Sequence, residues 1–234
     1  MKVAYEKQTI DATNPIARFA HRSRYMSSLA IVTAELATFG TLLDFGSGKG
    51  HFLNLLHERR PEANLLGFEP YQDHEAAHYD SIKAKELVED DSVDIVTCFE
   101  TLEHLYDDEI AEFVTFVKRV LAPGGKLVVS VPIIGGPTIL LKEGNRYVLH
   151  RRMDYSVREL LRTSLTGRPA ARAENRRNSH KGFDYRALEK MLLGDFKLRQ
   201  RAFSPFQGAP WFANSQVFWT FEGKQQPAGV SLVA

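Results

Sequence analysis

Residues 41–52 read TLLDFGSGKGHF and decide the fold of this chain. An apolar run ends in an acid, glycine then occupies every second position from Gly46 to Gly50, and an apolar helical pattern begins at Phe52. This order predicts a buried strand, a turn with few side chains, and the start of a helix. Backbone amides in such a turn can approach a ligand closely, because glycine has no Cβ and tolerates a positive φ.

A second apolar run, Leu65 to Phe68, ends in Glu69, nineteen residues after Gly50. In nucleotide-type α/β folds, an acid at the tip of the second strand holds the hydroxyls of a ribose. The two motifs together predict a site for a ribose-containing ligand.

Length and composition indicate a single globular domain with additions. The 234 residues are 44% hydrophobic and 11% aromatic, which is enough to bury a substantial core. Thirty basic residues stand against 29 acidic ones, a net charge of +1, so the chain as a whole shows no preference for nucleic acid.

Cysteine usage and hydropathy indicate a cytoplasmic protein. Cys98 is the only cysteine, which excludes an internal disulfide and a multi-cysteine metal site, and its apolar surroundings predict a core residue. The start, Met1 to Lys7, has no apolar signal core, and the uncharged stretch Leu127 to Leu141 is short and interrupted by prolines and glycines. We therefore expect neither export nor a membrane span.

Strands and helices alternate through the middle of the chain. Apolar runs predict strands near 41–45, 64–69, 81–84, 93–99 and 126–132. Helical spacing predicts helices near 51–59, 71–78 and 107–121. Short connections between alternating strands and helices predict a parallel sheet that is covered on both faces.

The C-terminal part predicts a different arrangement. A helix is expected from Asp184 to about Leu193, followed by strands near 196–203 and 216–221 with no helix between them. The last two strands should therefore form an antiparallel hairpin at the edge of the sheet. The expected fold is a doubly wound, Rossmann-like α/β sheet of seven mostly parallel strands.

An N-terminal helix precedes this sheet. Asn14-Pro15 is typical of a helix start, and helix-compatible sequence runs to about Thr38. Its basic residues are Arg18, His21, Arg22 and Arg24. They form either a solvated helix face or a cluster in which one member meets a carboxylate or an anionic substrate.

A long basic insertion, residues 134–182, lies between the fifth strand and the helix at Asp184. It carries a net charge of +7 in a chain whose total net charge is +1, and it holds a short helical pattern from Val157 to Leu165. Insertions of this length are usually functional or mobile. It is either a solvated or oligomer-forming flap, or a lid that recognises a negatively charged acceptor.

Four motifs in order resemble those of class I S-adenosylmethionine-dependent methyltransferases of the small-molecule type. They are residues 43–50 (LDFGSGKG), Glu69, residues 91–104 (DSVDIVTCFETLEH) and residues 121–127 (LAPGGKL). The first is similar to the cofactor-binding motif, the third to the fourth-strand motif, and the last to the turn into strand five.

The resemblance is close over residues 41–133 and looser over 180–222. It divides the chain into an N-terminal helical cap (1–40), a methyltransferase domain (41–222) with the inserted lid (134–182), and a tail (223–234).

The resemblance implies S-adenosylmethionine as the cofactor. The residues that it places at the cofactor are Asp44, Gly46, Ser47, Gly48, Gly50, Glu69, Pro70 and Glu100. The family often has a further acid after strand three that binds adenine. Here that region offers only Glu86, so either Glu86 or backbone groups are expected to take this role.

Methyl transfer is an in-line displacement at the sulfonium methyl, and a hydroxyl acceptor needs a base that takes its proton. His104 follows strand four on the side where the methyl should point, and His180 precedes the next helix start, so we expect both in the catalytic site. Alternatively, His104 only braces its turn, and Asp184 is expected to be a helix N-cap.

A metal site is a further alternative. Glu100-x-x-Glu103-His104 offers two carboxylates and an imidazole for magnesium or zinc. A similar cluster occurs in metal-assisted small-RNA and quinone-pathway O-methyltransferases. Many members of the larger family have the same residues without a metal, so no metal ligand is assigned.

The expected reaction moves a methyl group to an O or N atom of a small molecule or of a saccharide or lipid-linked acceptor, which the basic insertion suggests is anionic. DNA is excluded, because the motifs of amino-methylating nucleic-acid enzymes and a catalytic Pro-Cys pair are absent. RNA is an alternative acceptor, which the basic insertion would bind. A further alternative is a non-catalytic cofactor-binding module that serves as a partner subunit.

Nicotinamide or flavin binding is disfavoured, since the turn is G-x-G-x-G and not G-x-G-x-x-G. The oligomeric state is not predicted.

Overall fold

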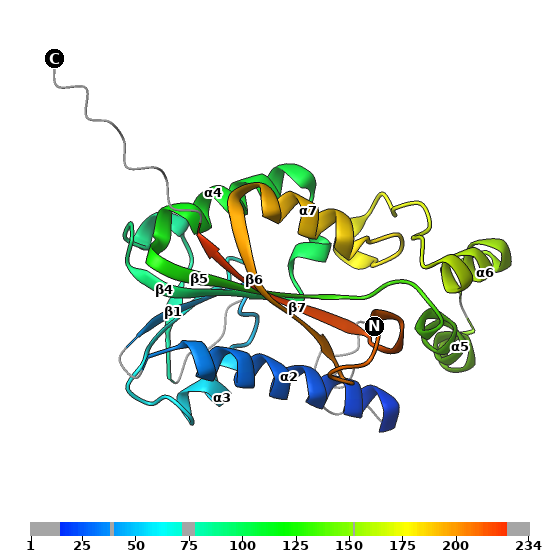
Figure 1. The fold of residues 1–234 in the computed structure, drawn as a ribbon, viewed down its shortest axis with the longest axis horizontal. Coiled ribbons are helices and arrows are strands. Elements are labelled where there is room, and N and C mark those ends of the chain that lie inside the picture. Colours follow the sequence, from blue (N-terminus) through cyan, green and yellow to red (C-terminus); the bar gives the residue numbers. More distant parts are fainter. Residues whose placement is uncertain (1–14, 38–39, 72–77, 152, 224–234) are drawn as a thin grey trace, which may run out of the picture.

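The computed structural model describes residues 15–37, 40–71, 78–151 and 153–223. Its centre is a seven-stranded sheet in the order β3-β2-β1-β4-β5-β7-β6 (Figure 1). The strands are β1 Thr41–Phe45, β2 Asn64–Phe68, β3 Asp80–Ile82, β4 Val93–Phe99, β5 Leu121–Pro132, β6 Phe196–Ser204 and β7 Gln216–Gly223.

Strand directions confirm the predicted sheet. The pairs that join β3, β2, β1, β4 and β5 are all parallel, whereas β7 is antiparallel to both β5 and β6. The sheet is therefore mostly parallel with an antiparallel hairpin at one edge. Because all five parallel strands end on the same side, the loops after β1, β2 and β4 meet there.

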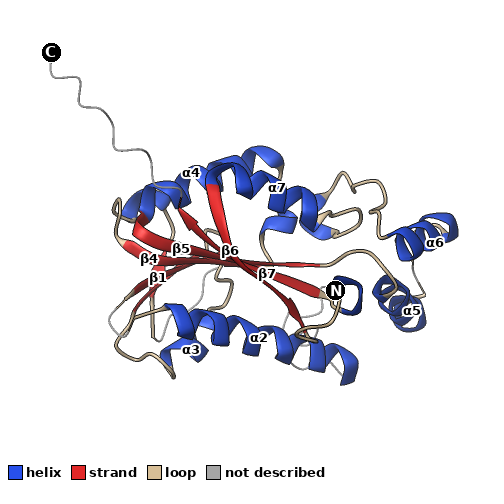
Figure 2. Cartoon of the chain, in the orientation of Figure 1, coloured by secondary structure: helices blue, strands red, loops and turns tan. Residues whose placement is uncertain are grey.

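Helices cover both faces of the sheet (Figure 2). On one face lie α2 (Pro15–Glu35) and α3 (His51–His57), and on the other lie α4 (Asp107–Val120) and α7 (Tyr185–Asp195). The remaining helices, α5 (Thr138–His150) and α6 (Val157–Thr166), pack on each other at one end of the molecule.

Two hydrophobic cores follow from the alternation of side chains along β1. Leu42 packs into the core under α2 and α3, together with Val32 and Leu53. Leu43 points the other way, into the larger core that contains Phe113 of α4. A parallel strand buried on both faces reads as a continuous apolar run, which is why β1 was recognisable in the sequence.

Some expectations are corrected and others fall outside the described residues. The insertion contains a second helix, α5, that the sequence did not predict, and β3 spans 80–82 where 81–84 was predicted. Most of the helix predicted near 71–78, the predicted cap Asn14 and the tail beyond Gly223 lie outside the described residues. Among the described helices, none has the length and apolar character needed to cross a bilayer.

Candidate functional site

The turn after β1 depends on its glycines. Gly46, Gly48 and Gly50 all have positive φ, of 79°, 53° and 71°. A Cβ at Gly46 would collide with the Thr101 side chain, and one at Gly50 with the Tyr79 ring, whereas a Cβ at Gly48 would meet no atom within 4 Å. Gly46 and Gly50 are therefore needed for packing, and Gly48 leaves open space beside the backbone.

Glu69 lies directly against this turn. Its Oε2 accepts a hydrogen bond from the Gly48 amide at 3.2 Å, and its Oε1 accepts one from the Tyr71 amide at 2.9 Å. The Gly46 amide in turn donates to the Phe68 carbonyl at 2.9 Å, which ties the turn to the end of β2. The carboxylate is buried, and each oxygen keeps a second lone pair for a ligand.

A cavity of about 560 Å³ opens in front of the turn. Its walls include seven of the eight residues predicted at the cofactor, namely Asp44, Gly46, Ser47, Gly48, Glu69, Pro70 and Glu100. Gly50 is not in the wall; it is the N-cap residue of α3. The ends of β1, β2 and β4 thus converge on one crevice, as the parallel topology requires.

Asp44 occupies an unusual position for an acid, inside the sheet at the cavity floor. It is buried, and the Thr97 hydroxyl donates to its Oδ1 at 2.7 Å. Burial raises the pKa of Asp44 to about 7; the Thr97 hydrogen bond opposes this shift, and the charge of Glu69 adds to it. The carboxyl therefore gains or loses its proton near neutral pH.

Helix α2 contributes a cation to the cavity. Arg24 forms an ion pair with Glu100, with 2.9 Å between Nη1 and Oε2. Glu100 also accepts a hydrogen bond from the Gln216 side chain. The prediction that one member of the N-terminal basic cluster meets a carboxylate is confirmed for Arg24. Arg24 also donates to His21 Nδ1 at 2.9 Å, and burial, with help from the Arg24 charge, lowers the pKa of His21 to about 4.

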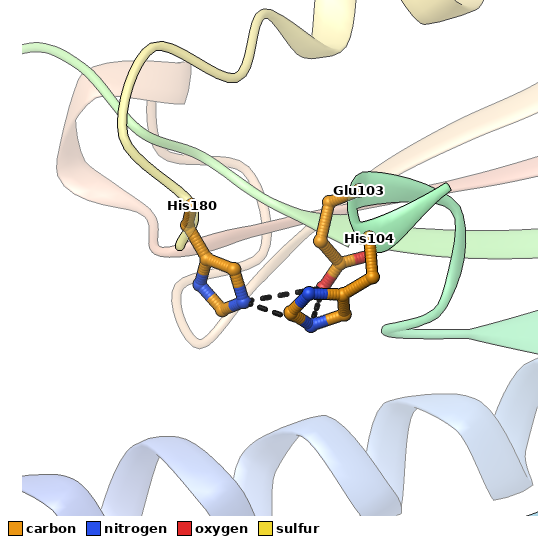
Figure 3. Close-up of side chains that lie close together, drawn as sticks. All are labelled: Glu103, His104 and His180. Atoms are coloured by element: carbon orange, nitrogen blue, oxygen red, sulfur yellow. Dashed lines mark hydrogen bonds and ion pairs between the residues drawn. The ribbon is translucent and has the colours of Figure 1, made fainter. Parts of the chain in front are cut away.

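His104 and His180 are in contact although 76 residues separate them (Figure 3). The two Nε2 atoms lie 3.0 Å apart, and His104 lines the cavity whereas His180 is not among the wall residues. Nδ1 of His104 is 3.2 Å from the Arg176 carbonyl, which assigns the proton of a neutral imidazole to Nδ1. Burial lowers the pKa of His180 to about 3, and the charge of Lys142 acts in the same direction.

Other wall residues were not singled out in the sequence. They include Tyr25, Ser28, Lys49, Lys85, Phe99, Thr101 and Arg177. Lys85 is the residue after strand three that reaches the wall, whereas Glu86 is exposed and outside it. Among the described residues of the basic insertion, Arg177 lines the cavity, and it also pairs with Glu109 of α4. The positions of charged residues and glycines in the sequence indicate loops, but they do not show which basic side chain of a segment lines the cavity.

Comparison with known families decides the classification. A family model described as "Methyltransferase domain" matches residues 18–166, from α2 to the end of α6. The chain belongs to this methyltransferase family. The match includes the glycine turn, Glu69 and His104 of this methyltransferase, and it ends before His180. No curated protein sequence matches the chain.

Solved structures share the fold of this methyltransferase at low sequence identity. A protein from Pyrococcus horikoshii OT3 has a TM-score of 0.62 at 16% identity, over 94% of this chain and 97% of its own. The 1,6-didemethyltoxoflavin-N1-methyltransferase of Burkholderia thailandensis has 0.59 at 15%, over 87% and 83%. The N-methyltransferase NodS of Bradyrhizobium japonicum WM9 has 0.50 at 15%, over 90% and 98%. The fold is that of the class I S-adenosylmethionine-dependent methyltransferases.

Proposed function

We propose that this methyltransferase binds S-adenosylmethionine in the cavity at the ends of β1, β2 and β4. The observation that carries the proposal is the pairing of Glu69 with the Gly48 amide in the cavity wall. There a carboxylate with free lone pairs stands beside backbone that has no side chain, which suits a ribose and the chain attached to it. The Burkholderia enzyme was solved with S-adenosylhomocysteine bound, which supports the same cofactor here.

The residues of the cavity wall have different roles in binding the cofactor. Glu69 binds the ribose hydroxyls, and Gly46, Ser47 and Gly48 supply the close backbone. Asp44 and Pro70 shape the floor and rim, Gly50 fixes the turn without touching the ligand, and Glu100 faces the cofactor with its charge balanced by Arg24. S-adenosylmethionine supplies a methyl group on a good leaving group, so the chain mainly positions the reactants and excludes water.

The acceptor side is formed by His104 and His180. With its Nδ1 proton directed at the Arg176 carbonyl, His104 presents Nε2 as a proton acceptor. A hydroxyl acceptor would use it, and an amine would need only to be neutral. Arg177, in the same wall, favours a small molecule or saccharide that carries a carboxylate or phosphate. On this proposal, residues 134–182 act as the lid of the 41–222 domain, and residues 1–40 act as its cap.

An acceptor screen with labelled S-adenosylmethionine tests the proposal. We expect methyl transfer to small anionic acceptors, little transfer to their neutral analogues, and none to DNA. His104→Ala should lower turnover at least about tenfold while the affinity for the cofactor stays the same. Unchanged turnover of His104→Ala would refute its catalytic role. Transfer to RNA alone, or cofactor binding without transfer to any acceptor, would replace the proposed substrate class.

A further inference from the structure

Glu103, His104 and His180 meet at one point beside the cavity (Figure 3). Glu103 and His104 belong to the short turn Leu102–His104 after β4, and His180 lies on the segment that leads into α7. Nε2 of each histidine is 3.9 Å from Oε1 of Glu103, and the two Nε2 atoms are 3.0 Å apart. Within the described residues, this is the group of His, Cys, Asp or Glu side chains with the spacing of metal ligands.

Glu103 is the member of the cluster whose carboxylate is buried without a hydrogen-bond donor. Its side chain is 0% exposed, and neither carboxylate oxygen has a hydrogen-bond partner. Leaving such a buried acceptor without a partner is unfavourable, most of all when the group is charged. Burial, with help from the charge of Glu100, raises the pKa of Glu103 well above its usual value. The positive charges of Arg24 and Lys142 oppose this shift, but neither donates a hydrogen bond to the carboxylate. A cation between Glu103 and the two imidazoles would satisfy the carboxylate directly.

The second ring nitrogen of His104 points to the same conclusion. A histidine that binds a metal through one nitrogen usually donates its other N–H to a carbonyl or carboxylate. Nδ1 of His104 faces the Arg176 carbonyl in this way, so the lone pair of Nε2 is directed into the cluster. Atoms bound to one zinc ion at about 2.0–2.2 Å lie about 3–3.5 Å apart, close to the spacing of the two imidazole nitrogens.

The geometry points to a binding site for a divalent transition-metal ion formed by Glu103, His104 and His180. Two imidazoles and one carboxylate suit ions such as Zn²⁺ or Mn²⁺ better than Mg²⁺, which prefers oxygen ligands. Three protein ligands leave coordination positions free. Since His104 is also in the cavity wall, the ion lies where the acceptor is proposed to bind, and this role of the ion rests on the proposed function. In the ion-bound chain Nε2 of His104 is a ligand and does not take the acceptor proton. Glu100 is excluded from the set because it is paired with Arg24.

The site is tested by metal titration of the full chain without cofactor or acceptor. After chelator dialysis, calorimetry with ZnCl₂ and MnCl₂ should show one site per chain, and zinc should raise the melting temperature. Glu103→Gln and His180→Ala should each weaken zinc binding at least about tenfold and abolish that rise. His57→Ala is the control, because His57 and His78 stack at 4.5 Å but belong to no such cluster in the described chain.

The outcomes separate the site from the proposed function. If the wild-type chain binds no ion stoichiometrically, or if Glu103→Gln binds as tightly as the wild type, the site does not exist. If Glu103→Gln fails to fold, His180→Ala gives the same answer, since His180 is partly exposed. Metal binding without methyl transfer would support the metal site and refute the proposed function. Methyl transfer without metal binding would support the proposed function and refute the metal site.

Discussion

The three glycines of residues 46–50 share a left-handed backbone but differ in what surrounds them. Gly46 and Gly50 have no room for a Cβ, because Thr101 and Tyr79 occupy that space. Gly48 has room, yet its amide faces Glu69 in the cavity wall. A side chain at Gly48 would therefore compete with a ligand more than with the protein.

Gly48→Ala should weaken S-adenosylmethionine binding at least about tenfold and destabilise the fold only by the cost of a left-handed alanine, about 1–2 kcal/mol. The matched control is Gly124→Ala, because Gly124 has a φ of 81° and equally open surroundings but lies away from the cavity. Calorimetry and thermal unfolding of both variants check this. Equal cofactor affinity in the two variants would contradict the proposed position of the ligand.

At the scale of elements, an ion pair between Arg24 and Glu100 links α2 to the loop after β4 at the cavity wall. Arg24 and Glu100 have side chains only 13% and 17% exposed, and Glu100 itself has a φ of 52°, which is uncommon for a residue with a side chain. The pair therefore connects the helix to the loop that precedes His104.

Arg24→Gln should leave Glu100 with an unbalanced, mostly buried charge and lower the free energy of unfolding by about 1–3 kcal/mol. We also expect faster hydrogen exchange in α2 and a lower rate of methyl transfer. Arg22→Gln is the control, since Arg22 is exposed on the same helix. Hydrogen exchange of α2 that is the same in both variants would show that the ion pair does not hold the helix.

The secondary structure of the insertion was predicted less completely than that of the sheet. Part of helix α6 was predicted, because Val157 to Leu165 follow helical spacing. Helix α5 was not predicted, because Gly144 and charged residues interrupt its apolar pattern. The two helices pack mainly on each other and leave Leu141 and Leu165 largely exposed, at 71% and 83%. The apolar residues of α5 and α6 do not face the main core. The spacing of apolar residues that predicts core-facing helices therefore does not identify such helices.

For the whole molecule, the buried Asp44 links stability to pH. Its pKa is about 7 in the folded chain and 3.8 in the absence of burial. Between these values the unfolded chain has released the proton that the folded chain retains. The unfolded state then binds fewer protons, so stability falls as pH rises from about 4 to about 7 and the full loss remains above that range.

Asp44→Asn should remove this contribution while keeping an acceptor for the Thr97 hydroxyl. Relative to the variant, we expect the wild type to lose about 3 kcal/mol of unfolding free energy between pH 5 and pH 8. Urea unfolding without cofactor at pH 5 and pH 8 measures it, with the exposed Asp91→Asn as control. Parallel pH profiles for wild type and Asp44→Asn would contradict the protonated, buried state.

Most of the fold was predictable because β1, β4 and β5 are buried on both faces and α4 has a clear apolar stripe, so periodicity alone located them. The glycine turn and Glu69 were predictable because a ligand site at strand ends needs those residue types at that spacing. The contact of His104 with His180 was not predictable, since it depends on how the insertion returns to the sheet. The same holds for the pairing of Arg24 with Glu100, because nothing in a helical pattern shows which cation reaches a distant loop.

The central claim is that a cofactor ribose is held at Glu69, and titration calorimetry with S-adenosylmethionine tests it most directly. The wild type should bind one equivalent, Glu69→Gln should bind at least about tenfold more weakly, a loss of about 1.4 kcal/mol, and the exposed Glu86→Gln should bind like the wild type. Circular dichroism should show that each variant is folded. Binding by Glu69→Gln that equals the wild type, or a wild type that does not bind S-adenosylmethionine, would contradict the account.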